Sequence, residues 1–416
     1  MADMKNSTRS DVRSRRSEPN FILAWMCLLV GVNQLGFGSV VPSLPLYAKS
    51  FDVTGSAIGM AVGIYGLARF IVALPAGRLA DDLGRRPSLA IGGVISGLGN
   101  LWCAWATNYL EFLIARFVAG AGASIIVTVG LIVSADISVP ERRGWMLAVF
   151  MGCFIFAVGV GPFPGGILAE AYGLSAPFLA FGVANILATC VAWFAIVETR
   201  GYQQGDGTNV FVSTNFGNQV RQLCHRLGFL LLVCLLGFAN AASRTGGLFA
   251  IVPVFASVQI GLSVSQIGFA LMIGSVSGLL ASYPTGSLAD HYGRKAIIVP
   301  ATILAGASMI AFAISENYTA FVFASIIWGV ASTAGGAVPT AYAADVAPAG
   351  MNAAAIASYR AVGDAGYVIG PLALGLIVDL YGSECALVVA ATVMGVVGVL
   401  FAIMAPETVE HGTRAK

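Results

Sequence analysis

The long apolar runs of this sequence contain only five formally charged residues, which are Arg69, Arg116, Arg244, Arg360 and Asp364. A charge at the centre of a bilayer costs about 2.5–3.5 kcal/mol, so each of them is a candidate functional group that should face a polar interior. Four guanidinium groups and one carboxylate make that interior net positive. Because a guanidinium fork matches carboxylates and phosphates, the set favours a small ligand that is anionic, zwitterionic or rich in acceptors.

Asp364 is the only acidic residue inside these runs. A carboxyl group in a medium of low dielectric can load and release a proton near neutral pH, which makes Asp364 the first candidate for proton coupling. Arg360 lies one helical turn earlier, so a fixed ion pair that keeps Asp364 charged is the alternative. Asn33 and Gln34 stand near mid-depth of the first run, where they either bind the ligand or bond neighbouring helices.

The elements that must position these residues are transmembrane helices. Only 10% of the 416 residues are charged, whereas soluble domains average about 25%, so lipid must cover most of the outside. Twelve apolar runs approach or exceed the ~20 residues that a helix needs to cross the hydrocarbon. The sequence therefore predicts an all-α polytopic membrane protein. The runs cover 21–48, 56–77, 87–106, 112–135, 145–168, 175–197, 227–257, 264–285, 296–314, 318–344, 353–378 and 385–405.

The distribution of basic residues predicts the orientation. Of the 22 Lys and Arg, 17 fall in segments on the side of the N-terminus, and only Lys49 falls in a loop on the other side. The positive-inside rule therefore places both termini in the cytoplasm and the chain in the cytoplasmic (inner) membrane. The predicted parts are a disordered cytoplasmic tail over 1–20, six-helix bundles over 21–197 and 227–406, a cytoplasmic linker over 198–226, and a cytoplasmic tail over 407–416.

The two bundles are copies of one unit. Five short anchors in the first half recur in the second at one constant offset of 209 residues, which chance does not explain. Duplicated membrane folds bind substrate between the repeats and work by rocking one half against the other. The matched anchors are Gly77–Asp81 with Gly286–Asp290, Asp136 with Asp345, Gly161-Pro162 with Gly370-Pro371, Tyr172-Gly173 with Tyr381-Gly382, and Glu198-Thr199 with Glu407-Thr408.

The segment Gly77–Arg86 and its copy Gly286–Lys295 resemble the cytoplasmic loop motif of the major facilitator superfamily. The resemblance covers the whole chain and implies that fold, with two six-helix bundles related by a pseudo-two-fold repeat. It also implies a cytoplasmic gate, although Asp82 stands where the family usually has a basic residue. The alternative is a simple staple within the loop. The gate residues so implied are Gly77, Asp81, Arg85 and Asp136, with Asp290, Arg294 and Asp345 in the second half.

A second motif lies in the fifth run, where Ala157 is followed by Gly161, Pro162, Gly165 and Gly166. It resembles the helix 5 motif of the drug:proton antiporter branch of the same superfamily. A Gly-Pro pair kinks a helix, and the glycines let it press against a neighbour across the interface between the halves. Packing alone is the alternative. Gly370 and Pro371 occupy the matching place in helix 11, so we expect a hinge in both helices.

The segment Arg116–Gly122 resembles the helix 4 motif of the family, with Ala119 in place of its usual Gln. Together the motifs predict a secondary active transporter that exports a small organic molecule by alternating access, with proton coupling. A proton-coupled importer of an organic anion is the alternative, and a sensor or a lipid translocase is a third possibility.

No nucleotide-binding loop, nucleophile constellation or paired carboxylates occur, so we expect no enzyme. The three His and seven Cys lack metal-ligand spacing, so we expect neither a metal nor a cofactor. A net charge of +2 gives no reason to expect nucleic acid as a partner. The expected partners are the substrate, protons and membrane lipids, and the expected state is a monomer.

Overall fold

A computed structural model describes residues 18–138, 142–199, 216–334, 337–347 and 352–408, and every regular element in these ranges is a helix. Eleven helices are long and apolar enough to cross a membrane, and a shorter apolar segment, Tyr318–Ser332, lies at the tenth predicted run. The all-helical polytopic fold is thus confirmed. The predicted tails over 1–20 and 407–416 lie mostly outside the described residues.

The first half contains six predicted runs, two of which are divided. The first run becomes a long helix and a short one, and the fifth is divided at Gly161. The helices of this half are α2 (Pro19–Val40), α3 (Leu44–Lys49), α4 (Gly55–Leu83), α5 (Arg85–Trp105), α6 (Tyr109–Asp136), α7 (Arg143–Val160), α8 (Pro162–Tyr172) and α9 (Ala176–Ala195).

The second half repeats this plan with one irregular helix. Its first helix begins at Phe216, inside the stretch predicted as a linker, and continues into a π-helical segment. Residues 200–215 of that predicted linker lie outside the described ranges. The elements of this half are α10 (Phe216–Ala242), η1 (Ser243–Ile251), α11 (Val252–Val258), α12 (Val264–Tyr292), α13 (Arg294–Ala313), α14 (Tyr318–Ala334), α15 (Ala337–Val346), α16 (Asn352–Tyr381) and α17 (Ser383–Met404).

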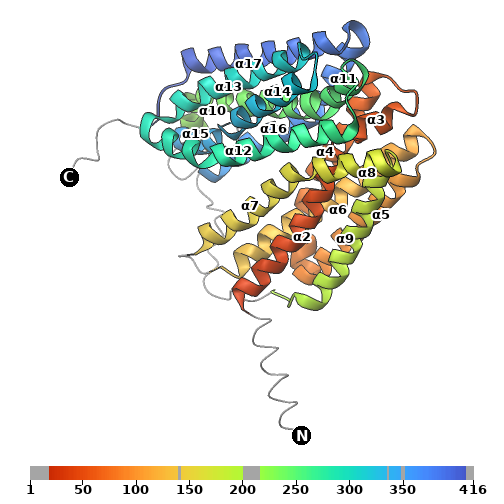
Figure 1. Cartoon of the computed structure of the whole chain (residues 1–416). Helices are drawn as coiled ribbons and strands as arrows, with labels where there is room; N and C mark the ends of the chain where they lie inside the picture. The colour runs from red at the N-terminus through yellow and green to blue at the C-terminus, as the bar shows by residue number, and fades with distance from the viewer. Residues whose placement is uncertain (1–17, 139–141, 200–215, 335–336, 348–351, 409–416) are drawn as a thin grey trace, which may run out of the picture.

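The two halves form a V (Figure 1). They meet where α3, α4, α8 and α11 lie, and they diverge toward the end at which α2 begins and α17 ends. We call that end the terminal face and the end where the halves meet the opposite face. Helices that are distant in sequence therefore lie together at the opposite face, α4 with α16 and α8 with α12.

Two equivalent glycine contacts close the opposite face. A Cβ added to Gly59 of α4 would lie 2.0 Å from the carbonyl oxygen of Pro371 in α16, and one added to Gly268 of α12 would lie 2.1 Å from that of Pro162 in α8. Gly59 and Gly268 are separated by the 209 residues of the sequence repeat, and so are Pro162 and Pro371. Only glycine lets two helix backbones approach so closely, so these contacts define a tight seam between the halves.

The glycines at the terminal face behave differently. A Cβ added to Gly77 or Gly286 would meet nothing within 4 Å. Gly77 and Gly286 therefore make no close helix contact in this conformation, because the halves have diverged at this end (Figure 1). The structure is closed at the opposite face and open at the terminal face.

Candidate functional site

A cavity of about 470 Å³ lies between the halves. Its two walls differ in character, since the first half offers mostly apolar side chains and the second half mostly polar ones. The wall from the first half consists of Gln34, Phe37, Arg69, Val127, Leu131, Met151, Phe154 and Val158. The wall from the second half includes Asn240, Ser243, Arg244, Thr245, Trp328, Ser332, Tyr359, Arg360, Asp364 and Tyr367.

Four of the five intramembrane charges line this cavity, namely Arg69, Arg244, Arg360 and Asp364. Arg69 from α4 interacts electrostatically with Asp364 and repels Arg244, both of which belong to the other half. The ion pairs found among the described residues involve Arg85 and Arg294, and Asp364 takes part in none. The fixed pair between Arg360 and Asp364 is thus absent from this conformation, so the carboxylate remains available to the cavity.

A π-helical segment positions Arg244. η1 presents Ser243, Arg244 and Thr245 to the cavity, and Phe249 follows one turn later. The Arg244 guanidinium carbon lies 5.6 Å from the Phe249 ring centroid and 6.0 Å from that of Trp328. π-Helical turns occur frequently at functional sites.

The sequence analysis predicted neither η1 nor the place of Trp328 in the cavity lining. The one signal for η1 is the combination of Gly246-Gly247 with Pro253 downstream, because adjacent glycines and a proline weaken a regular helix.

Arg116 lies apart from the main cavity. Its side chain is 1% exposed, its Nε donates to the Ala61 carbonyl oxygen at 3.4 Å, and its guanidinium carbon lies 4.5 Å from the Tyr65 ring centroid. Within the described chain, Arg116 Nη1 and the hydroxyl of Tyr367 have no hydrogen-bond partner, and both residues line one void of about 10 Å³. A void of this size is at the lower limit for holding one water molecule. The void joins Arg116 of the first half to Tyr367 of the second.

The two amides of the first run take different positions. Gln34 lines the cavity. Asn33 is fully buried, and its Nδ2 donates to Ser96 Oγ of α5 at 3.4 Å. The expectation of a cavity role is corrected for Asn33, because consecutive residues of a helix point about 100° apart and only one of the two can face the other half.

The helix 5 motif contacts helices of both halves. A Cβ on Gly161 or Gly165 would meet the carbonyl oxygens of Leu35 and Ser39 in α2, whereas one on Gly166 would meet that of Val264 in α12. Gly166 thus faces the seam directly, as does the Pro162 carbonyl oxygen, which meets Gly268 of the same helix α12.

The two expected hinges differ. α7 ends before Gly161 and α8 begins at Pro162, so helix 5 is divided there. α16 continues through Gly370 and Pro371 to Tyr381, and Gly370 packs against Ala242. Helix 11 is therefore continuous through its Gly-Pro pair in this conformation, unlike helix 5, and its role as a hinge stays a prediction.

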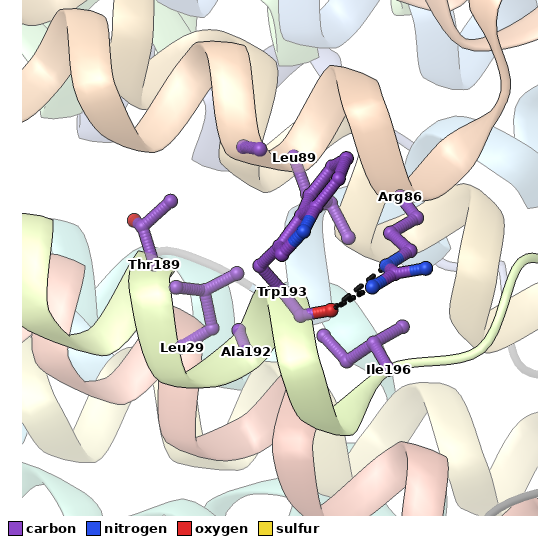
Figure 2. Close-up of a pocket in the computed structure, with 8 residues that line it drawn as sticks. Leu29, Arg86, Leu89, Thr189, Ala192, Trp193 and Ile196 are labelled. Atoms are coloured by element: carbon purple, nitrogen blue, oxygen red, sulfur yellow. Dashed lines mark hydrogen bonds between the residues drawn. The ribbon is translucent and has the colours of Figure 1, made fainter.

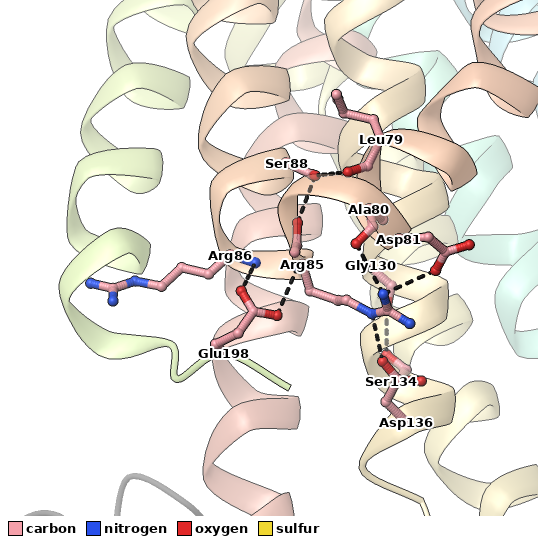
Figure 3. Close-up of polar contacts among 11 residues, drawn as sticks. Leu79, Ala80, Asp81, Arg85, Arg86, Ser88, Gly130, Ser134, Asp136 and Glu198 are labelled. Carbon is pink, nitrogen blue, oxygen red and sulfur yellow. Dashed lines mark hydrogen bonds and ion pairs between the residues drawn. The ribbon is translucent and has the colours of Figure 1, made fainter. Parts of the chain in front are cut away.

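The loop motif forms an ion-pair cluster (Figure 3). Arg85 Nη1 lies 3.0 Å from Asp81 Oδ1, and Arg85 Nε lies 2.9 Å from Asp136 Oδ2. In the second half, Arg294 Nε lies 2.8 Å from Asp345 Oδ2, while the side chain of Asp290 lies outside the described part. Each cluster joins helices of a single half, so in this conformation it organises the end of a bundle.

The glutamate of each repeated Glu-Thr pair caps the helix that begins within the loop motif. Glu198 accepts hydrogen bonds from the backbone N–H groups of Arg85 and Arg86 at 2.8 and 3.1 Å, which caps the start of α5 (Figure 3). Glu407 caps α13 with the same distances from Arg294 and Lys295. Free N–H groups and the helix dipole at a helix start both favour a carboxylate.

Replacing Gly84 by Ala should destabilise the first half. Gly84 has φ = 101°, and its Cβ would lie 2.7 Å from a Glu198 carboxylate oxygen. Strain of this kind costs about 1–3 kcal/mol, so we expect a fall of a few degrees in the melting temperature in detergent. Gly395→Ala is the control, because its Cβ would meet nothing within 4 Å. Equal melting curves for the two variants would contradict the prediction.

A small crevice lies between α2, α5 and α9 (Figure 2). The Arg86 guanidinium carbon lies 4.3 Å from the Trp193 ring centroid, and Arg86 also donates to the Trp193 carbonyl oxygen. The void is about 10 Å³ and is otherwise lined mainly by apolar side chains such as Leu29 and Ile196. It is far smaller than the central cavity, and its contacts fasten α9 to α5.

Comparison with known proteins identifies the family. The sequence profile of the Major Facilitator Superfamily matches residues 26–278 and 233–416. An uncharacterized MFS-type transporter of Methanocaldococcus jannaschii is 25% identical over 88% of this chain and 92% of its own length. The quinolone resistance protein NorA of Staphylococcus aureus is 26% identical over 59% of this chain and 61% of its own.

Solved structures share the fold. The nucleoside transporter NupG has a TM-score of 0.75 at 15% identity, over 91% of this chain and 98% of its own. A D-xylose-proton symporter has a TM-score of 0.70 at 15% identity, over 93% of this chain and 99% of its own. The duplicated helices, the cavity between the halves and the family match agree, and the chain is therefore a multi-pass membrane transporter of the Major Facilitator Superfamily and not an enzyme.

Proposed function

We propose that this transporter exports small amphipathic zwitterions in exchange for protons by alternating access, with both termini in the cytoplasm. The carrying observation is the cavity between the halves, in which two arginines and one carboxylate of the second half face a mostly apolar wall that carries Arg69. In this proposal the terminal face is cytoplasmic, and the structure represents the inward-open state. The gate residues of the loop motif would then join the halves only in the other state.

The division of the cavity supports an amphipathic substrate. Val127, Leu131, Met151 and Phe154 offer an apolar wall to a hydrophobic body. Across from it, Arg244 and Arg360 offer guanidinium groups that match a carboxylate. Because Arg69 repels Arg244 across the cavity, an anionic group bound between them would also offset that repulsion.

Exchange and co-transport would differ in how the substrate and a proton affect each other's binding at Asp364. A zwitterion would place its ammonium group at Asp364, so the ammonium and a proton would compete for one carboxylate. Such competition couples the two fluxes in opposite directions. An organic anion without an amine would bind better when Asp364 is protonated, which couples the fluxes in the same direction. The alternative importer therefore predicts the opposite dependence on pH.

The relatives give further support for export. NorA is named for quinolone resistance, and Multidrug resistance protein 2 of Bacillus subtilis is 22% identical over 64% of this chain and 66% of its own length. The D-xylose-proton symporter among the similar folds keeps the importer as the second candidate.

A screen on purified protein in proteoliposomes with an imposed pH gradient tests the proposal. Amphipathic zwitterions, organic anions and lipophilic cations are compared in both directions. We expect zwitterions to move in the direction opposite to the proton flux. We also expect their binding to release protons from the protein. Movement of anions together with protons would replace this proposal by the importer.

Replacing Arg69 by Ala should weaken the binding of a carboxylate-bearing substrate. Losing one hydrogen bond to a charged group costs about 1.5–3 kcal/mol, so the Kd should rise roughly tenfold or more. Arg78→Ala is the matched control, because Arg78 is an exposed arginine of the same helix outside the cavity lining. Isothermal titration of both variants with the best substrate of the screen measures the difference. Unchanged affinity in Arg69→Ala would assign Arg69 a structural role.

A further inference from the structure

Two carboxylates at the opposite face bind helix starts that belong to the other half. Asp379, near the end of α16, accepts hydrogen bonds from the backbone N–H groups of Gly55 and Ser56 at the start of α4. The distance from Ser56 N to Asp379 Oδ2 is 2.9 Å. The hydroxyl groups of Thr54 and Ser56 lie beside the same carboxylate. This contact joins the second half to the first.

The repeat supplies a second contact of the same kind. Glu170, near the end of α8, accepts a hydrogen bond from the backbone N–H of Ser265 at the start of α12, at 3.3 Å. Glu170 precedes Asp379 by the same 209 residues that separate Ser56 from Ser265. Each half thus presents one carboxylate to the other half and receives one in return.

The carboxylates that cap helices at the terminal face provide the contrast. Glu198 caps α5 and Glu407 caps α13, and each contact lies within a single half. A rocking motion of two rigid halves leaves such contacts intact. The contacts of Glu170 and Asp379 must break when the opposite face opens, because their partners then move away with the other half.

Breaking these contacts costs free energy, because the N–H groups at the helix starts lose their hydrogen-bond partners. The first N–H groups of a helix have no partner within it, and a carboxylate there makes charge-assisted hydrogen bonds with a favourable dipole. Neither Glu170 nor Asp379 takes part in an ion pair found in the described ranges, so their partners are the helix starts themselves.

We propose that Glu170 and Asp379 form a pair of latches that hold the opposite face shut and thereby set the balance between the two states of the transporter. The latch pair goes beyond the substrate and proton chemistry of the cavity, although it rests on the alternating access proposed above. Loss of one latch should favour the state that is open at the opposite face, and loss of both should favour it further.

Labelling of one buried cysteine tests this. In a variant without the native cysteines, Leu248→Cys provides a site that is 2% exposed and lines a void between the halves with Val41 and Pro162. A membrane-impermeant maleimide added from the opposite face reaches it only when the seam opens. We expect Glu170→Gln and Asp379→Asn each to raise the labelling rate roughly 2- to 5-fold, and the double variant about tenfold.

Two controls separate the latch from a general effect of charge. Glu316→Gln removes an exposed carboxylate from the loop between α13 and α14 and should leave the labelling rate unchanged. Glu170→Asp and Asp379→Glu retain the charge and should label more slowly than the neutral variants. A double variant that labels at the parental rate, or a Glu316→Gln variant that accelerates equally, would overturn the proposal. The assay needs no substrate or pH gradient, so its result is independent of the proposed transport chemistry.

Discussion

Replacing Asp364 by Asn is expected to abolish transport driven by a pH gradient while substrate still exchanges between the two sides. Asp364 is the only carboxylate that lines the described cavity, so replacing it by an amide removes the one carboxyl group there that can load and release a proton near neutral pH. Coupling between two ligands typically amounts to about a 5- to 150-fold change in affinity, and we expect the loss of driven accumulation to reach that range. Accumulation and counterflow are measured in proteoliposomes with and without the gradient.

The conservative variant sharpens this test. Asp364→Glu retains an ionisable group on the same wall of α16 and should keep part of the driven transport. Arg360→Gln should weaken substrate binding yet leave the fluxes coupled, because Asp364 forms no ion pair with it in this conformation. Driven transport by Asp364→Asn at the parental pH dependence would exclude Asp364 as the proton carrier.

Replacing Gly59 by Leu is expected to stop the transport cycle by preventing closure of the opposite face. Its Cβ would lie 2.0 Å from the Pro371 carbonyl oxygen, which is part of a helix backbone and cannot rotate away. Overpacking costs about 1–3 kcal/mol, which shifts the balance between the two states by roughly 5- to 150-fold. The maleimide assay should therefore show fast labelling from the opposite face, together with loss of net transport.

The repeat supplies matched variants for this prediction. Gly268→Leu should act like Gly59→Leu, because its Cβ would lie 2.1 Å from the Pro162 carbonyl oxygen. Gly77→Leu should also block transport but should slow labelling from the opposite face, since Gly77 has open space in the present state and must pack in the other. Gly395→Leu has open space and should transport normally. Normal transport by Gly59→Leu would refute the role of this seam.

The sequence by itself determined the architecture. Run length, low charge and the constant 209-residue offset predict the duplicated helical fold because they are properties of single segments that lipid solvates directly. The cavity charges were also recognisable, since a charge inside an apolar run must avoid lipid whatever its neighbours are. Arg69, Arg244, Arg360 and Asp364 accordingly all line the central cavity.

Tertiary structure alone decided which of these groups share a site. Arg116 carries the same sequence signal as Arg69, yet it lies in a separate void with Tyr367. The sequence also could not decide which of Asn33 and Gln34 faces the cavity, because that depends on which helices pack against them.

The four capping carboxylates show the physical reason most clearly. Glu198 and Glu407 bind helix starts within their own halves, whereas Glu170 and Asp379 bind helix starts of the other half. All four are acidic residues near helix ends, and the two residues of each pair are 209 positions apart in the sequence. Whether such a contact is permanent or breaks during transport depends on which rigid body supplies the partner, and only the packing of the two halves determines that.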